Sequence, residues 1–136
     1  MSFRPRRSRL VDVKLTSREL TEVSAEVALS FSDRVARGSD RGQSGELSVL
    51  RTVANATLRA VEKLSDGRLH CRLAELNRVR AFGRELVMVL VEVEAGGERA
   101  QLLGKCYVTE RLEEAAARAA LDATNRYFEY MTSTPS

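Results

Sequence analysis

The chain has 136 residues, of which 43% are hydrophobic and 30% charged, and its formal net charge is +3. This length gives room for one domain with a hydrophobic core, and the composition excludes a disordered chain. The two cysteines are too few for a disulfide framework, and the sequence has neither a signal peptide nor an apolar stretch of transmembrane length. We therefore expect a cytoplasmic protein with reduced thiols and no membrane contact.

Much of the positive charge lies at the N-terminus, in Arg4, Arg6, Arg7 and Arg9. Residues 1–8 are expected to form a disordered basic tail, and residues 132–136 a second tail, on either side of a single domain at 9–131. Arginines in such a tail could bind phosphates, although Phe3 is the only aromatic residue near them. A small nucleic-acid-associated protein that uses these four arginines is therefore one functional alternative.

The first half of the chain predicts three strands and a helix. A short strand is expected over 10–15, with a turn near Ser17 and Arg18. Over 22–31, apolar side chains at 23, 25, 27, 29 and 31 alternate with polar ones at 22, 24, 26 and 30, which predicts a half-buried strand. A turn at 32–34 leads to a third strand over 35–39. Apolar residues then recur at three- and four-residue spacing over 46–64, which predicts a helix.

The ends of this helix have sequence signals of their own. Ser44 is the expected N-cap, and Ser65, Asp66 and Gly67 form a stop signal.

The second half repeats this order. We expect a strand over 69–80 and another over 86–94, which is apolar on both faces and therefore central in its sheet. The two glycines at 96 and 97 predict a hairpin into a third strand over 99–108. A long helix over 112–131 follows, and its small residues lie on two stripes. One stripe would cover its own sheet, and the other would contact a second helix in the same chain or in another copy.

The two halves match at a constant offset, which indicates an internal duplication. Leu10–Val13 matches Leu73–Leu76, and Ala56–Ala60 matches Ala119–Ala123, in both cases 63 residues apart. The same offset aligns Val23 with Leu86 in the middle strands, whereas Gly38 and Gly104, which have the same role, are 66 apart. We predict an α+β fold of two βββα units, 9–66 and 67–131, with two antiparallel three-stranded sheets packed with two helices.

The last helix carries a resemblance to a known family. Its alanine-rich run over 114–126 resembles the end of the regulatory (dimerisation) domain of α-isopropylmalate synthases and citramalate synthases, which also consists of two strand-strand-strand-helix units. The resemblance covers residues 9–131 in architecture. It implies a free-standing, non-catalytic module for small-molecule sensing or oligomerisation, and a homodimer whose ligand lies where the two units meet. The paired glycines of that family are single here, at Gly38 and Gly104, and its catalytic barrel is missing.

A candidate ligand site lies in the segments 38–45 and 104–110, which precede the two helices and are equivalent under the repeat. Glycines and hydroxyl residues before a helix can present backbone N–H groups to an anion. We therefore predict a small anionic or zwitterionic ligand that contacts the first segment, although a solvated connection is the alternative. The residues assigned to this site are Arg37, Gly38, Arg41, Gly42, Ser44 and Gly104.

No catalytic or metal constellation stands out. His70 is the only histidine, and its strand neighbour Cys71 should point to the opposite face, so the pair cannot share a metal ion. Glu113 and Glu114 suit the first turn of a helix, where acidic residues interact favourably with the helix dipole. We therefore expect no enzymatic activity, no cofactor and no bound metal.

Overall fold

The computed structural model describes residues 7–133, without the side chains of residues 18, 19 and 128–133. Its elements are β1 (Arg9–Glu19), β2 (Glu22–Phe31), β3 (Arg34–Gln43), α1 (Glu46–Leu64), β4 (His70–Ala81), β5 (Arg84–Ala95), β6 (Glu98–Tyr107) and α2 (Leu112–Ser133). The expected α+β class and the two βββα units are therefore confirmed. The tail expected at 1–8 lies outside the described residues except for Arg7 and Ser8, and that at 132–136 except for the last two residues of α2.

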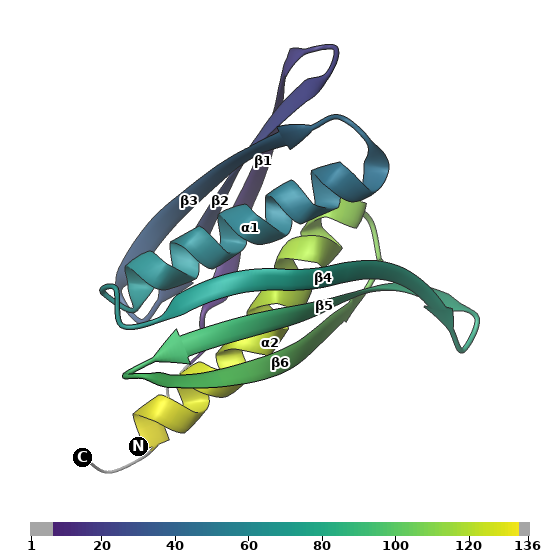
Figure 1. The fold of residues 1–136 in the computed structure, drawn as a ribbon. Helices are drawn as coiled ribbons and strands as arrows, with labels where there is room; N and C mark the ends of the chain where they lie inside the picture. Colours follow the sequence, from purple (N-terminus) through teal and green to yellow (C-terminus); the bar gives the residue numbers. More distant parts are fainter. Residues whose placement is uncertain (1–6, 134–136) are drawn as a thin grey trace.

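Each unit is an antiparallel sheet with its own helix on one face (Figure 1). The strand orders are β1-β2-β3 and β4-β5-β6, so β5 is central, as its apolar character predicted. Contacts of α1 with α2 and β4, and of α2 with β1, join the two units into one hydrophobic core. We call the helix-covered face of each sheet its inner face and the opposite face its outer face.

A glycine in each third strand brings the helix close to the sheet. A Cβ on Gly38 would lie 2.1 Å from the carbonyl oxygen of Ala56 in α1, and a Cβ on Gly104 would lie 2.1 Å from that of Ala119 in α2. No other residue fits at such a distance, because both contacts are far inside van der Waals separation. The equal role expected for these two glycines is therefore confirmed.

The duplication extends to irregular features of the strands. Register shifts occur beside Val11 in β1 and beside Ala74 in β4, at positions 63 residues apart. In the middle strands, however, Val27 pairs with Gly38 and Val89 pairs with Gly104, which makes the offset 62. The alignment of the middle strands at 63 was therefore wrong by one residue. Successive side chains of a strand point to opposite faces, so an error of one residue exchanges inner-face and outer-face positions.

Two expected turns are confirmed and one is wrong. The hairpin between β5 and β6 turns at Gly96 and Gly97, whose φ values of 58° and 82° are in the left-handed region that glycine favours. The turn before Arg34 also forms, with Ser32 at φ 58°. The first hairpin turns at residues 20 and 21 rather than near Ser17, because β1 continues to pair with β2 as far as Glu19.

The segment expected as a glycine-rich loop before α1 is mostly strand. β3 continues through Gln43, and its residues pair with β2 along the whole length. Ser44 is not the N-cap, because that position is Gly45, and the Ser44 hydroxyl instead donates a hydrogen bond to the carbonyl oxygen of Leu20 at 2.9 Å. Pairing with a central strand outweighed the local preference of glycine for turns.

Both small-residue stripes of α2 are used inside the monomer. The alanines at 115, 116, 117, 119, 120 and 123 are all buried, as are Leu121 and Thr124. The small side chains permit the close approach to α1 and to the inner face of the second sheet. Over this part of α2, no small-residue face is left for a second copy of the chain.

Neither α1 nor the described part of α2 combines the length and the apolar character that crossing a lipid bilayer requires.

We expect Gly38→Ala and Gly104→Ala each to lower the free energy of unfolding by about 2–3 kcal/mol, because the added methyl group must push the helix away from the sheet. Chemical denaturation measures the change. Ser39→Ala, at an exposed position next to Gly38 in the same strand, is the matched control and should shift stability by less than about 0.5 kcal/mol. Equal stabilities of the glycine variants and the control would contradict the close packing.

Candidate functional site

The helix of each unit hydrogen-bonds the free edge of the other unit's sheet. Cys71 near the start of β4 turns its N–H and C=O away from β5. Its N–H donates to Glu62 of α1 at 2.9 Å, and its carbonyl accepts from Arg59 at 2.6 Å. An ion pair of 2.9 Å joins Arg59 to Glu62. An otherwise unpaired strand edge is thus satisfied by side chains of the first unit.

The second unit makes the same contact to the first. The N–H of Ser8, just before β1, donates to Asn125 Oδ1 of α2 at 2.9 Å, and the carbonyl of Ser8 accepts from Asn125 Nδ2 at 3.2 Å. Ser8 and Cys71 are 63 residues apart, as are Glu62 and Asn125. We call these two sets the cross-unit bonds. They place Ser8 firmly in the domain.

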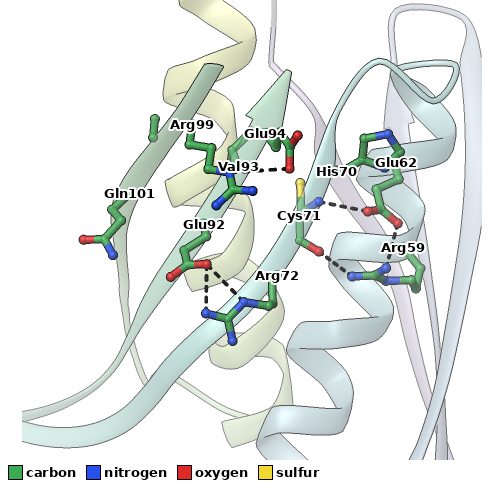
Figure 2. Close-up of a pocket in the computed structure, with 11 residues that line it drawn as sticks. Arg59, Glu62, His70, Cys71, Arg72, Glu92, Val93, Glu94, Arg99 and Gln101 are labelled. Carbon is green, nitrogen blue, oxygen red and sulfur yellow. Dashed lines mark hydrogen bonds and ion pairs between the residues drawn. The ribbon is translucent and has the colours of Figure 1, made fainter. Parts of the chain in front are cut away.

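One cleft lies beside the Cys71 contact, where α1 passes the end of the second sheet (Figure 2). It has a volume of about 680 Å³, and we call it the junction cleft. Its charged and polar lining residues are Arg59, Glu62, His70, Arg72, Glu92, Glu94, Arg99 and Gln101. Three arginines therefore face three glutamates, and the charges balance.

The charges of the junction cleft pair with one another. Arg72 bonds Glu92 at 3.0 Å and 2.8 Å, and this hydrogen bond is the main reason that the pKa of Glu92 lies below its usual range. Arg99 and Glu94 form a looser pair, with a distance of 3.8 Å. Because the internal partners satisfy these groups, the junction cleft presents no excess charge to a ligand.

A second cleft lies beside the Ser8 contact, between the start of β1 in the first unit and β6 and α2 of the second. It has a volume of about 780 Å³ and is lined by Arg7, Ser8, Arg9, Leu10, Lys105, Cys106, Arg118, Leu121, Asp122 and Asn125. Four of these residues are basic and one is acidic, so we call it the basic cleft. The single carboxylate, that of Asp122, accepts a hydrogen bond from the backbone N–H of Lys105 at 3.0 Å.

Ser8 adds a polar group to this cleft. The residue is 4% exposed, and its hydroxyl is buried without a hydrogen-bond partner among the described residues. A buried hydroxyl without a partner costs free energy, so such groups are uncommon in folded proteins. The basic cleft thus combines an excess of positive charge with a buried hydroxyl beside it that has no partner in the described part of the chain.

The residues assigned to the ligand site from sequence do not lie together. Gly38 and Gly104 are buried beneath α1 and α2 on the inner faces of two different sheets. Arg37 and Arg41 lie on the outer face of the first sheet, where Arg37 forms an ion pair with Glu26 at 3.3 Å.

The two other assigned residues contact nearby side chains and backbone. Gly42 packs against Thr52 of α1, and Ser44 bonds the backbone at Leu20 and Thr21. Ligand binding by the six residues stays a prediction, but the loop on which it rested is a strand.

The structure describes only two of the four arginines assigned to nucleic-acid binding. Arg4 and Arg6 lie outside the described residues, whereas Arg7 and Arg9 are exposed and line the basic cleft. Sequence reasoning missed Lys105 and Arg118, which come from β6 and α2. No local motif indicated them, because the contact between Ser8 and Asn125 brings β6 and α2 next to the start of β1.

Cys71 and His70 point to opposite faces, as the strand pattern predicted. Burial, with a smaller effect of Glu62, raises the pKa of the Cys71 thiol to about 12, so the thiol stays protonated at neutral pH. Among the described residues, no three histidine, cysteine or acidic side chains are grouped so that they could hold a metal ion.

We expect the Cys71 thiol to resist alkylation in the folded protein, because with a pKa of about 12 only roughly one thiol in 10,000 is ionised at pH 8. Cys106→Ser leaves Cys71 as the single thiol. Mass spectrometry after treatment with N-ethylmaleimide should show slow labelling in buffer and fast labelling in denaturant. Equally fast labelling in both conditions would show that the thiol is exposed and reactive.

No protein-family model matches the sequence, and no curated protein matches it either. The resemblance to the regulatory domain of α-isopropylmalate synthases therefore stays an expectation, and the two clefts carry the functional argument.

Proposed function

We propose that this protein is a non-catalytic module that binds a small anionic molecule in the basic cleft. The observation that carries the proposal is the excess of positive charge in this cleft, which four basic side chains and one carboxylate line, beside a buried Ser8 hydroxyl with no hydrogen-bond partner among the described residues. A carboxylate or phosphate group accepts hydrogen bonds from both hydroxyl and guanidinium groups, and bonds to charged groups are the stronger ones. The volume of the cleft, about 780 Å³, also suits a small ligand.

Comparison with the junction cleft supports this choice. Each cleft lies beside a cross-unit bond, and the two bonds are equivalent in the duplicated fold, although different strands complete the two clefts. In the junction cleft, acidic residues balance the arginines, and Cys71 stands where the basic cleft has Ser8. The cross-unit bond itself therefore does not require basic residues, and the excess positive charge is particular to the cleft beside Ser8.

A non-catalytic role agrees with the state of the buried Cys71 thiol. The pKa of the Cys71 thiol is far above neutral, and its backbone is held by both Glu62 and Arg59. The thiol therefore serves packing in the core, where it is 5% exposed.

Nucleic-acid binding is the second candidate, and the basic cleft favours it too. Arg7 and Arg9 continue into the N-terminal arginines at 4 and 6, so a polyanion could extend from the cleft along the chain terminus. Binding of a single-stranded oligonucleotide with a steep dependence on salt, together with no binding of small anions, would favour this candidate over the first.

Two variants test the proposal with opposite effects. Ser8→Ala removes the unpartnered hydroxyl, so the free energy of unfolding should stay equal or rise by about 1 kcal/mol while anion affinity falls. Arg118→Glu should weaken binding by roughly 10- to 150-fold, because a charge-assisted hydrogen bond contributes about 1.5–3 kcal/mol. Calorimetric titration with inorganic phosphate, citrate and a single-stranded oligonucleotide measures the affinities.

Arg41→Glu is the matched control, because Arg41 is exposed on β3 and belongs to the ligand site expected from sequence. Unchanged affinity in this variant is the expected result. If Arg41→Glu weakens binding and Arg118→Glu does not, the ligand lies at the third strand and the basic cleft is not the site.

A further inference from the structure

The outer faces of the two sheets differ in character, although they occupy equivalent places in the duplication. On the first sheet, the central strand presents Ser24, Glu26 and Ala28 outward. The equivalent residues of the second sheet, 62 positions later, are Leu86, Met88 and Leu90.

Two positions of the third strands differ in the same sense, whereas Val35 and Ser39 of β3 correspond to the polar residues Gln101 and Lys105 of β6. Arg37 and Arg41 of β3 lie at the places that Leu103 and Tyr107 occupy in β6. Leu103 is 49% exposed and Tyr107 39% exposed. The polar set on the first sheet shows that this fold does not need apolar residues at these positions.

The apolar residues of the second outer face do not belong to the core of the monomer. The core consists of inner-face residues such as Val87, Val89 and Val91 together with the two helices. Leu86 is only 6% exposed, yet it lies outside this core. On one flank of the face, the guanidinium of Arg84 stacks over the Tyr107 ring, 4.0 Å from its centre. Lys105 lies on the same face between Leu103 and Tyr107, so the apolar side chains surround one charged residue. A group of apolar residues on the surface, with polar groups at its edge, is typical of an interaction site.

We propose that this outer face binds a second copy of the chain, with a two-fold axis that runs along the strands between β5 and β6. Such an axis places β5 of one copy over β6 of the other and keeps residues of the same register opposite each other. Leu90 then faces the partner's Leu103, and Leu86 faces the partner's Tyr107, since both pairs are neighbours in the sheet register.

The charges at the end of the face fit the same arrangement. Glu94 is the register neighbour of Arg99, so the two-fold axis sets Glu94 of each copy against the partner's Arg99. Their bond within one chain is loose, at 3.8 Å, and the Arg99 side chain is 83% exposed, so both groups are accessible to a second copy. Polar residues of β4, Glu75 and Asn77, fall at the rim. A face whose pattern matches itself under a two-fold axis is what an isologous dimer requires.

The dimer does not use the small-residue stripes of α2, which are buried within the monomer. Lys105 belongs both to this outer face and to the basic cleft, so the interface is tested without an added anion. The sequence analysis offered a small-residue stripe of the last helix as a contact between copies. The outer face of the second sheet takes the place of that stripe in the proposed dimer. The surface is also distinct from the polar outer face of the first sheet, which provides an internal comparison.

Sedimentation equilibrium without added ligand tests the interface. At micromolar concentration, the protein should have twice the chain mass of 15.1 kDa. Leu103→Glu should weaken dimerisation by roughly 100-fold or more, because two carboxylates are buried at the centre of the interface. Val35→Glu is the matched control, since Val35 is 61% exposed on the outer face of the other sheet, and it should leave the dimer intact. Circular dichroism verifies that both variants fold.

A mixing experiment tests the register directly. Glu94→Arg and Arg99→Glu should each form weak homodimers, because like charges then face each other across the axis. An equimolar mixture of the two variants should form a heterodimer of wild-type strength, since every facing pair is again of opposite charge. A wild-type protein that sediments as a monomer at high micromolar concentration would overturn the proposal. So would a dimer that survives Leu103→Glu, or one that Val35→Glu also dissociates.

Discussion

The fold depends on hydrogen bonds that each unit makes to the edge strand of the other. A three-stranded sheet with one helix buries too little apolar surface to be stable alone, and it leaves two strand edges unpaired. Glu62 and Arg59 satisfy the backbone of Cys71, and Asn125 alone satisfies that of Ser8. Different side chains thus form hydrogen bonds to the edge-strand backbone at equivalent positions. The geometry of the contact, rather than the identity of the residues, is what the two units share.

Comparison of the two units distinguishes residues that the fold requires from residues that it does not require. Gly38 and Gly104 are equal because both helices pack directly on the third strand, and any side chain there would displace the helix. Outside these constrained positions the units differ. The second sheet has an apolar outer face, whereas the first has a polar one, and the cleft beside Ser8 is basic, whereas the cleft beside Cys71 is neutral. The difference between the equivalent outer faces carries the dimer proposal, and the excess positive charge beside Ser8 carries the ligand proposal.

Much of the fold could be predicted from the sequence, because periodicity and offset are local signals. The helix at 46–64, the hairpin at Gly96 and Gly97, and the central place of β5 were correct. The third strand of the first unit was predicted to end at residue 39, because the glycines that follow indicated a loop. In the structure this segment continues as a strand and pairs with β2. The alignment of the middle strands was one residue out, because strand register is set by pairing and bulges rather than by local composition.

The clefts were harder to predict than the elements. The basic cleft brings together residues near positions 8, 105 and 118, which come from β1, β6 and α2, and no local motif joins them. The unpartnered hydroxyl of Ser8 follows from the cross-unit bond to its backbone, which buries the residue. Ser8 was predicted to lie in a disordered tail, so the burial of its hydroxyl could not be expected from the sequence.

Native-state amide hydrogen exchange, followed by NMR, tests the cross-unit bonds most directly. In Glu62→Ala, the Cys71 amide should lose protection while the Ser8 amide keeps it, and Asn125→Ala should have the reverse effect. Each variant should lower the free energy of unfolding by about 1–3 kcal/mol, because a buried backbone group is left without a partner. Glu62→Gln keeps an acceptor oxygen and should retain most of the protection at Cys71. Unchanged protection of both amides in the two alanine variants would contradict the account.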